Sequence, residues 1–452
     1  MNAIYRRLRI LIAFLILSGV VLPVEGNSLV TGTTEVVSVA SDGRQGDCFS
    51  QYPSISSDGR YVAFESCSSN LVEDDTNSEY DVFLHDRLTG ETIIVSVASD
   101  GAHGNGWSGY PSISSDGRHV VFLSSSDNLV DGDTNGILDV FVHNQDTGET
   151  VRVSVASDGT EANYASYYPA ISADGRYIAY TSDSSNLVEG DTNDTGDIFV
   201  HDLMDGETSR VSVASDGTQG NENSSGDSVS ANGRYIAFSS AASNLVDDDT
   251  NSEPDIFVHD RWSEETTRVS VSSDGDQVND DTGGPSISAD GRIVAFESIA
   301  STLVEGDTNG VNDVFVHDRQ TGETRRVSVV SDGTQGNNAS WFTTISGDGR
   351  YVAIESAASN LVDGDTNNDV DIFVHDRQTG ETTRVSVASD GTQGNNDSFY
   401  PSISGDGRFV TFFSEASNLF RWDSNYTSDV FVHDREGVWI EPLLVWLPMA
   451  VK

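Results

Sequence analysis

The stretch PSISSDGRYVAFES, residues 53–66, decides the fold of this chain because it contains two short strands separated by a tight turn. Asp58 and Gly59 both tolerate positive φ, and an Asp-Gly pair between strand-forming residues is a strong hairpin signal. The pattern predicts one strand over 53–56 and a second over 61–64, with an Asp-Gly turn between them.

This hairpin recurs seven times along the chain. Its Asp-Gly-Arg or Asn-Gly-Arg turn begins at a constant interval of 58 residues, at Asp58, Asp116, Asp174, Asn232, Asp290, Asp348 and Asp406. The string VSVxSDG keeps the same register from Val37 to Val385. Each unit continues with a loop that contains Asp-Thr-Asn or a variant of it, a third strand such as 82–85 and a fourth such as 93–97. No unit has helical periodicity.

Four strands in each of seven units predict an all-β fold, a seven-bladed β-propeller of four-stranded antiparallel blades. The chain enters with a lone fourth strand over 36–40 and leaves with three strands that end at 429–433. Pairing these fragments would complete the seventh blade and close the ring. A linear solenoid is the alternative, but it would leave both fragments as unpaired edges.

The stretches PSISSDGRYVAFES (53–66) and DVFVHDRQTGET (313–324) resemble the TolB-type, or PD40, relatives of WD40 propeller repeats. The resemblance covers nearly all of the chain after residue 26. Proline is common before the Asp-Gly turn in that family, whereas this chain has Ser, Ala or Gly there. The resemblance implies a propeller, but such propellers serve as binding platforms, enzymes and accessory domains alike, so it leaves function open.

The ends of the chain differ from the repeats. Arg6, Arg7 and Arg9 precede an apolar run over 10–22, which predicts a secretory signal peptide over 1–26, with an uncleaved anchor as the alternative. The propeller is expected over 27–436, and an apolar tail over 437–452. We therefore expect a secreted or cell-envelope protein.

The formal net charge is −48, and Lys452 is the only lysine. Such a chain repels nucleic acid and anionic lipid, and it favours divalent cations or a high-salt environment. An extracellular or envelope glycan or protein is the expected partner, and the chain is expected to be a monomer. Cys48 and Cys67 are compatible with a disulfide or with two free thiols.

The loop between the second and third strands carries oxygen-bearing side chains at its first, third, fifth and ninth positions in six units. Alternating oxygen ligands in a tight loop suit calcium, and the pattern resembles the DxDxDG-type loops of integrin α-subunit propellers. Turn formation without metal is the alternative. Arg421 in the seventh unit predicts no site there. The expected calcium ligands are Glu73, Asp75, Asn77, Asp81, Asp131, Asp133, Asn135, Asp139, Glu189, Asp191, Asn193, Asp197, Asp247, Asp249, Asn251, Asp255, Glu305, Asp307, Asn309, Asp313, Asp363, Asp365, Asn367 and Asp371.

Aromatic residues gather where the chain enters the first strand of five units, and Gly226 and Gly284 take that place in the other two. The first strand of a blade lies nearest the axis, so these side chains are expected to form an arc around the central opening. Aromatic rings near polar groups suit sugars or peptides. Packing between blades is the alternative. The candidate ligand-binding residues are Tyr52, Trp107, Tyr110, Tyr167, Tyr168, Trp341, Phe342, Phe399 and Tyr400.

The sequence favours a secreted, calcium-binding propeller that binds glycan or protein without catalysis. The alternative is a propeller enzyme, a glycan lyase or hydrolase, that uses the central opening. Glu161, Glu222 and Asp227 are acids found in single units, but they form no evident catalytic group. A histidine that recurs in every third strand is expected to be structural, because a catalytic residue is seldom needed seven times.

Overall fold

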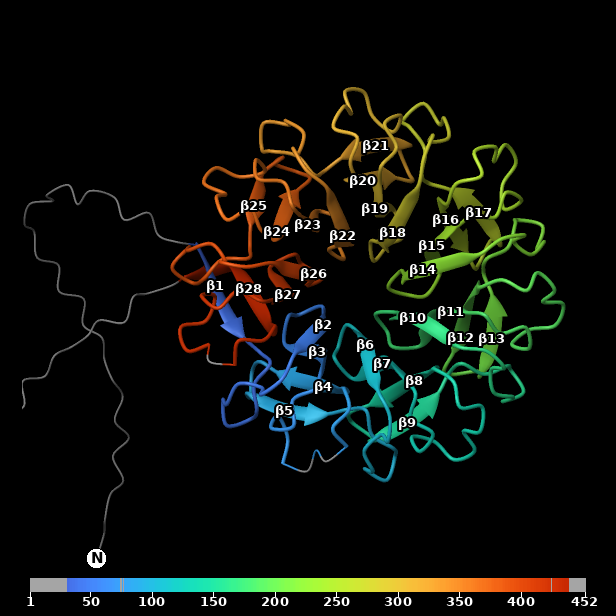
Figure 1. Ribbon diagram of the computed structural model, residues 1–452. Helices are drawn as coiled ribbons and strands as arrows, with labels where there is room; N and C mark the ends of the chain where they lie inside the picture. The colour runs from blue at the N-terminus through green and yellow to red at the C-terminus, as the bar shows by residue number, and fades with distance from the viewer. Residues whose placement is uncertain (1–30, 74, 76, 424, 439–452) are drawn as a thin grey trace, which may run out of the picture.

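The structure, a computed structural model, describes residues 31–73, 75, 77–423 and 425–438. Seven four-stranded antiparallel sheets stand around a central axis, and each sheet forms one blade of a propeller (Figure 1). The predicted fold is confirmed. The expected signal peptide and residues 439–452 of the expected tail lie outside the described residues. No helix among the described residues is long and apolar enough to span a membrane.

In each of the first six blades, the strands run outward from the axis in sequence order. Blades 1 to 3 consist of β2 (Ser50–Ile55), β3 (Tyr61–Ser66), β4 (Asp81–Asp86) and β5 (Glu91–Ile94); β6 (Ser108–Ile113), β7 (His119–Ser124), β8 (Asp139–Asn144) and β9 (Glu149–Arg152); and β10 (Ser166–Ile171), β11 (Tyr177–Ser182), β12 (Asp197–Asp202) and β13 (Glu207–Arg210). Blades 4 to 6 consist of β14 (Ser224–Val229), β15 (Tyr235–Ser240), β16 (Asp255–Asp260) and β17 (Glu265–Arg268); β18 (Thr282–Ile287), β19 (Ile293–Ser298), β20 (Asp313–Asp318) and β21 (Glu323–Arg326); and β22 (Ser340–Ile345), β23 (Tyr351–Ser356), β24 (Asp371–Asp376) and β25 (Thr382–Arg384).

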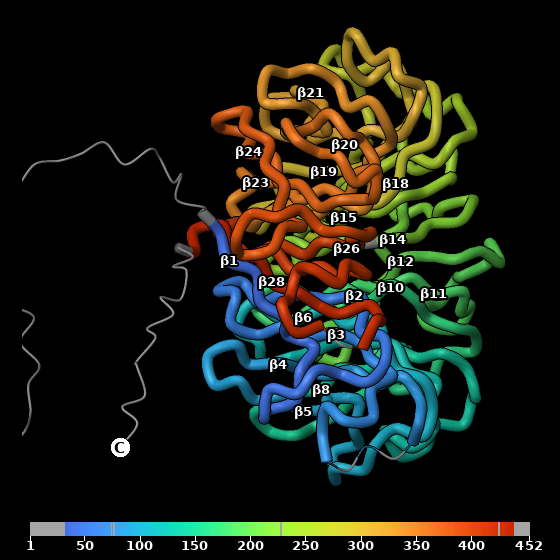
Figure 2. Tube along the Cα trace, turned by 60° about the vertical axis from the view of Figure 1, so that its left-hand side comes forward, coloured from blue at the N-terminus to red at the C-terminus, as the bar shows by residue number. Residues whose placement is uncertain are grey.

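Blade 7 is built from both ends of the described chain. It contains β26 (Ser398–Ile403), β27 (Phe409–Ser414) and β28 (Asp429–Val438), and β1 (Thr31–Val36) pairs with β28 as the outermost strand. Figure 2 shows β1 lying against β28 in the side view. The predicted ring closure is therefore confirmed, although the closing strand is 31–36 and not 36–40.

The fourth strands of blades 1 to 6 likewise begin and end earlier in the sequence than predicted, because the VSV string does not extend them. Ser96 leaves the ladder, and its hydroxyl donates to Asp81 Oδ1 at 2.6 Å while accepting from the backbone N–H of Val82. Val95 and Val97 remain buried beside it. The string therefore anchors the end of each outer strand to the start of the third strand, and it then leads to the next blade.

The hydrophobic core lies between neighbouring blades. One buried cluster combines Val82 and Leu84 of blade 1 with Val120, Phe122 and Phe141 of blade 2, and similar clusters recur around the ring. Because each blade buries its apolar faces against its neighbours, the blades stabilise one another and cannot bury this surface alone.

The recurring histidines are buried structural residues, as expected. His85 Nδ1 lies 2.8 Å from Thr92 Oγ1, and the Thr92 hydroxyl donates to the carbonyl of Val39 in the preceding blade. The same His–Thr contact occurs in the other six blades. Burial lowers the pKa of His259 to about 4, so the imidazole is neutral at pH 7 and acts only as a hydrogen-bonding group.

The seven Asp/Asn-Gly turns between first and second strands meet around the axis on the face opposite the acidic loops. The carbonyl at the position before each turn accepts a backbone N–H from the preceding blade, at 3.0 to 3.4 Å, and the seven bonds form a closed ring. In five blades the donor is the residue before the turn itself: Ser57, Ser115, Ala231, Ala289 and Gly405. Proline has no N–H, which explains why this chain departs from the TolB-type pattern at these five positions.

Candidate functional site

The face opposite this backbone ring contains a cavity of about 360 Å³ at the central axis. We call the seven residues around its mouth the rim: Tyr52, Tyr110, Tyr168, Gly226, Gly284, Phe342 and Tyr400. Each is the third residue of an innermost strand. Proline, serine and threonine residues of the same strands line the wall below them, and include Pro53, Ser54, Pro111, Ser112, Thr343 and Thr344.

The rim backbone lies in the left-handed region in every blade. The five aromatic residues have φ between 40° and 50°, and Gly226 and Gly284 have φ of 65° and 57°. Each aromatic rim residue lies where the pairing of its innermost strand shifts register, at a β-bulge. Non-glycine residues in sparsely populated backbone regions cost about 1–3 kcal/mol each. Five bulky side chains are therefore held at positions that glycine occupies without strain in the other two blades.

Four of the rim rings form a continuous row. Tyr110 stacks on Tyr52 at 4.4 Å between centroids, Tyr52 meets Tyr400 at 4.7 Å, and Tyr400 meets Phe342 at 4.3 Å. Tyr168 and Phe342 are 56% and 42% exposed, and they stand on either side of the gap made by Gly226 and Gly284. The structure thus brings together five of the nine aromatic residues predicted as ligand-binding.

The other four predicted aromatic residues do not line the cavity. Trp107 packs against Tyr110 at 6.0 Å, Tyr167 lies beside Tyr168, and Phe399 packs on Phe413 at 5.3 Å. Trp341 donates its indole N–H to Glu355. These residues are partly buried neighbours of the rim, because successive strand residues point to opposite faces and only one register position reaches the axis.

Three glutamates lie behind the rim, and the sequence reasoning missed them. Glu65 Oε2 accepts the backbone N–H of Tyr110 at 3.1 Å, and Glu355 Oε2 accepts that of Tyr400 at 2.9 Å. Glu297 Oε2 accepts the N–H of Phe342 at 2.9 Å. In each pair, the glutamate belongs to the second strand of one blade and holds the strained backbone of the next.

Burial changes the acidity of these carboxyl groups. It raises the pKa of Glu65 and of Glu355 to about 7, and it raises the pKa of Glu297 as well. No salt-bridge partner is found for them among the described residues. The sequence did contain a sign of these three glutamates. Each is a charged residue at the fifth position of an otherwise largely apolar strand (YVAFES, IVAFES or YVAIES), where the other blades have Leu, Thr, Ser or Phe.

The acidic loops hold a side-chain cation in five blades. The Nη1 atom of the last arginine of each outer strand lies 3.0 to 3.6 Å from the carboxylates at the third and ninth loop positions. In blade 3, Arg210 Nη1 is 3.3 Å from both Asp191 and Asp197. The five arginines are Arg152, Arg210, Arg268, Arg326 and Arg384. Glu161 also pairs with Arg152, at 3.1 Å.

The remaining loop side chains are not arranged as calcium ligands either. Asn135 donates its amide NH₂ to Asp139 and to the carbonyl of Ala162, while its Oδ1 accepts the N–H of Ile137. These bonds fix the amide with its nitrogen, not its oxygen, toward the aspartate. The first-position acids are exposed, and among the described residues no group of three or more His, Cys, Asp or Glu could hold a metal ion. The calcium prediction for blades 2 to 6 is therefore not confirmed, and in this structure an arginine supplies positive charge beside these carboxylates.

Blade 1 differs from these five blades. Its outer strand ends in Ile94, so the arginine of the other blades is missing there, and no described residue forms a salt bridge with Asp75 or Asp81. Asp75 Oδ1 is buried without a hydrogen-bond partner among the described residues, and burial raises the pKa of Asp81 to about 6. The calcium prediction for Glu73, Asp75, Asn77 and Asp81 stays a prediction.

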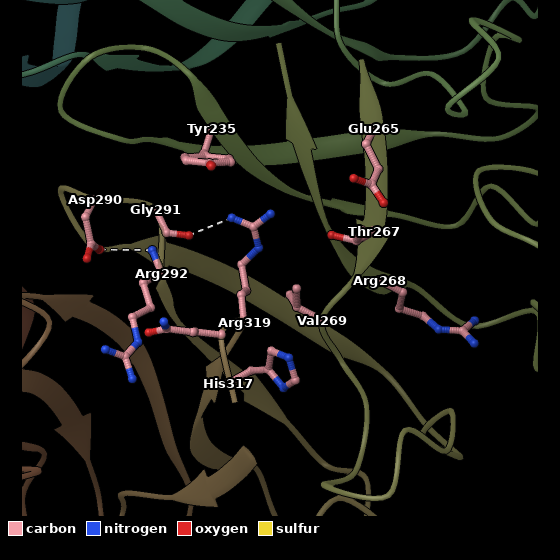
Figure 3. A pocket seen from close by; sticks show the side chains of 11 residues that line it. Tyr235, Glu265, Thr267, Arg268, Val269, Asp290, Gly291, Arg292, His317 and Arg319 are labelled. Atoms are coloured by element: carbon pink, nitrogen blue, oxygen red, sulfur yellow. Dashed lines mark hydrogen bonds between the residues drawn. The ribbon is translucent and has the colours of Figure 1, made fainter. Parts of the chain in front are cut away.

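A second group of cavities lies at the junctions between blades, on the side of the hairpin turns. Figure 3 shows the one between blades 4 and 5, where Arg319 donates to the carbonyl of Gly291 at 2.6 Å and lies over the Tyr235 ring. A Cβ at Gly291 would lie 2.0 Å from that ring, so glycine is required there. Arg261 makes the same contacts with Gly233 and Tyr177. Because the arrangement repeats, it is a structural junction.

A scan of protein-family models finds no match, and a search of curated proteins finds no relative. Solved structures do match. An oligogalacturonate lyase from Vibrio parahaemolyticus is 13% identical, with a TM-score of 0.52 over 89% of this chain and 97% of that one. An oligogalacturonate lyase in complex with manganese is 13% identical, with a TM-score of 0.55 over 89% and 96%. Pyrococcus horikoshii acylaminoacyl peptidase is 13% identical, with a TM-score of 0.52 over 86% of this chain and 52% of that one.

These similarities establish the fold and nothing finer, because the identities are low. They agree with the propeller that the TolB-type resemblance implies; the seven blades follow from the repeat and the observed sheets. Structures of this architecture include enzymes, so the fold alone does not decide between binding and catalysis.

Proposed function

We propose that this protein is a non-catalytic binding protein that captures a glycan in the rim cavity. The observation that carries the proposal is the backbone strain at the rim. Tyr168 is 56% exposed, so packing offsets little of the cost of its left-handed conformation, and Phe342 keeps 42% of its surface exposed although it meets Tyr400; the two glycine blades demonstrate a less strained choice. Aromatic side chains that stay exposed despite this backbone strain are better explained by ligand recognition than by a contribution to folding stability.

The chemistry of the cavity suits a sugar. Aromatic faces stack on the C–H faces of pyranose rings, and the hydroxyls of Ser54, Ser112 and Ser402 supply polar contacts in the wall. A protein outside the cytoplasm fits the predicted signal peptide and the disulfide between Cys48 and Cys67, since disulfides persist in oxidising compartments. Calcium belongs to this proposal only at blade 1.

The test is a glycan array or polysaccharide pull-down, with and without calcium, on the wild type and on a Tyr168→Gly/Phe342→Gly variant. We expect binding that the double substitution lowers at least ten-fold. Trp262→Ala is the matched control, because Trp262 is 67% exposed on a turn between third and fourth strands, on the other face. Unchanged glycan binding by the rim variant would refute the proposal.

An enzyme that acts on a glycan is the second candidate, favoured by one observation. Glu297 and Glu355 lie behind neighbouring rim residues with raised pKa values, as a general acid requires. The oligogalacturonate lyases of similar fold show that this architecture can support glycan cleavage in other proteins. Turnover of a bound oligosaccharide that is lost in Glu297→Gln would favour this candidate over simple binding.

A further inference from the structure

The charges around the rim cavity are all of one sign. Among the described residues, no lysine, arginine or histidine lines the cavity. The nearest charged groups identified behind the rim are the carboxyl groups of Glu65, Glu297 and Glu355, each bonded to a rim backbone N–H. The whole chain carries a formal charge of −48, so its field attracts cations and repels anions. An acidic glycan would meet no counter-charge here.

The gap in the rim is the place where a cation would be best accommodated. Gly226 and Gly284 leave this part of the mouth without side chains, and a Cβ built on Gly226 would meet nothing within 4 Å. A Cβ built on Gly284 would lie 3.5 Å from Cδ of Glu297, so that carboxyl group lies directly behind the gap. The missing side chains leave Glu297 closer to an incoming ligand than an aromatic residue would allow.

Aromatic rings border this gap on both sides. Tyr168 precedes it in blade 3 and Phe342 follows it in blade 6, and both rings are exposed. The faces of aromatic rings carry a negative quadrupole that attracts ammonium groups. Aromatic faces beside the gap and a carboxyl group behind it together form the pattern that binds a protonated amine.

We propose that the ligand carries a free amino group, as in an amino sugar without N-acetylation, and that its ammonium lies in the Gly226–Gly284 gap against Glu297. This inference rests on the proposed glycan-binding function and adds the charge of the ligand. For the same reason, we expect uronic acid polymers not to bind.

The experiment compares three hexasaccharides by isothermal titration at moderate salt: a glucosamine hexamer, its fully N-acetylated counterpart and a galacturonic acid hexamer. We expect the glucosamine hexamer to bind at least ten-fold more tightly than the acetylated one, and the galacturonic acid hexamer not to bind. Added salt should weaken the binding of the glucosamine hexamer, because a charge interaction is screened. Glu297→Gln should remove most of the preference, whereas Glu149→Gln, an exposed change on β9, should keep it.

The outcomes separate this inference from the proposed function. Equal or tighter binding of the acetylated hexamer overturns the amine inference while glycan binding stands. Failure of all three hexamers to bind, together with no glycan on an array, overturns both. A triglycine peptide with a free or acetylated N-terminus tests the other source of an amine, and preferential capture of the free peptide over every glycan would overturn the amino-sugar assignment. Even if Glu297→Gln does not fold, the comparison of the ligands on the wild type tests the amine inference.

Discussion

The backbone N–H of Gly405 donates a hydrogen bond of 3.0 Å to the carbonyl oxygen of Ser57, which joins the seventh blade to the first. These residues are far apart in the sequence, and each stands before an inner hairpin turn. Their bond closes the ring of seven that runs around the axis, so ring closure depends on this contact as well as on the pairing of β1 with β28.

We expect Ala289→Pro to lower the free energy of unfolding by about 1–3 kcal/mol, because it removes the N–H that donates to Gly347 and leaves a carbonyl unpaired. Ala173→Pro is the matched control, since the donor in blade 3 is the N–H of Asp174. Chemical denaturation measures the free energy of unfolding of the two variants. Equal losses in the two variants would argue against a role for the ring bond.

Tyr168→Gly is expected to leave the free energy of unfolding unchanged or to raise it by about 1 kcal/mol, because glycine relieves the strain at φ 49°. Tyr180→Gly, which empties a fully buried site, should lower it by several kcal/mol. Thermal and urea denaturation compare the two variants. A large loss of stability in Tyr168→Gly would mean that the rim rings are packing residues.

Glu65→Gln should stabilise the protein at pH 8 but not at pH 4. Burial raises the pKa of Glu65 from 4.5 to about 7, so folding favours the neutral acid and the wild type loses stability as the pH rises between these values. Glutamine keeps the acceptor for the Tyr110 N–H without the charge. The gain at pH 8 is expected to be about 2–3 kcal/mol.

Unfolding free energies measured across this pH range test that prediction. Glu149→Gln, an exposed substitution on β9, is the matched control for the loss of one carboxylate. A gain for Glu65→Gln that is the same at both pH values would contradict the raised pKa.

Ile94→Arg is expected to place in blade 1 the cation that blades 2 to 6 already contain. The new guanidinium should pair with Asp75 and Asp81, lower the pKa of Asp81 from about 6 and raise stability at pH 7.5 by about 1 kcal/mol. Ile93→Arg, whose side chain leaves the other face of β5, should destabilise the protein. Titration of Asp81 by NMR, with denaturation, distinguishes the two.

Calcium should raise the melting temperature of the wild type through blade 1 alone, since a ligand that binds only the folded state stabilises it. Scans with calcium and with chelator, on the wild type and on Ile94→Arg, test this expectation. The arginine variant should not respond to calcium. An unchanged melting temperature in the wild type would end the calcium prediction.

The sequence by itself determined the number of blades, the order of their strands and the closure of the ring, because a hairpin signal repeated every 58 residues leaves few other ways to bury the apolar faces. It also pointed to the rim, since Tyr52 and its counterparts recur at one position of each unit beside the strand signal nearest the axis, although the structure places them within that strand. These features follow from local pattern and repetition, which are visible along the chain.

Only the tertiary structure decided which charges meet. Arg210 is 13 residues from Asp197 and 19 from Asp191, and nothing in the sequence placed its guanidinium between them. Glu297 and Phe342 belong to different blades, and their contact depends on how adjacent blades pack. Side-chain partners across strands and blades depend on three-dimensional distance, so the sequence could not show that an arginine lies beside the loop aspartates in blades 2 to 6.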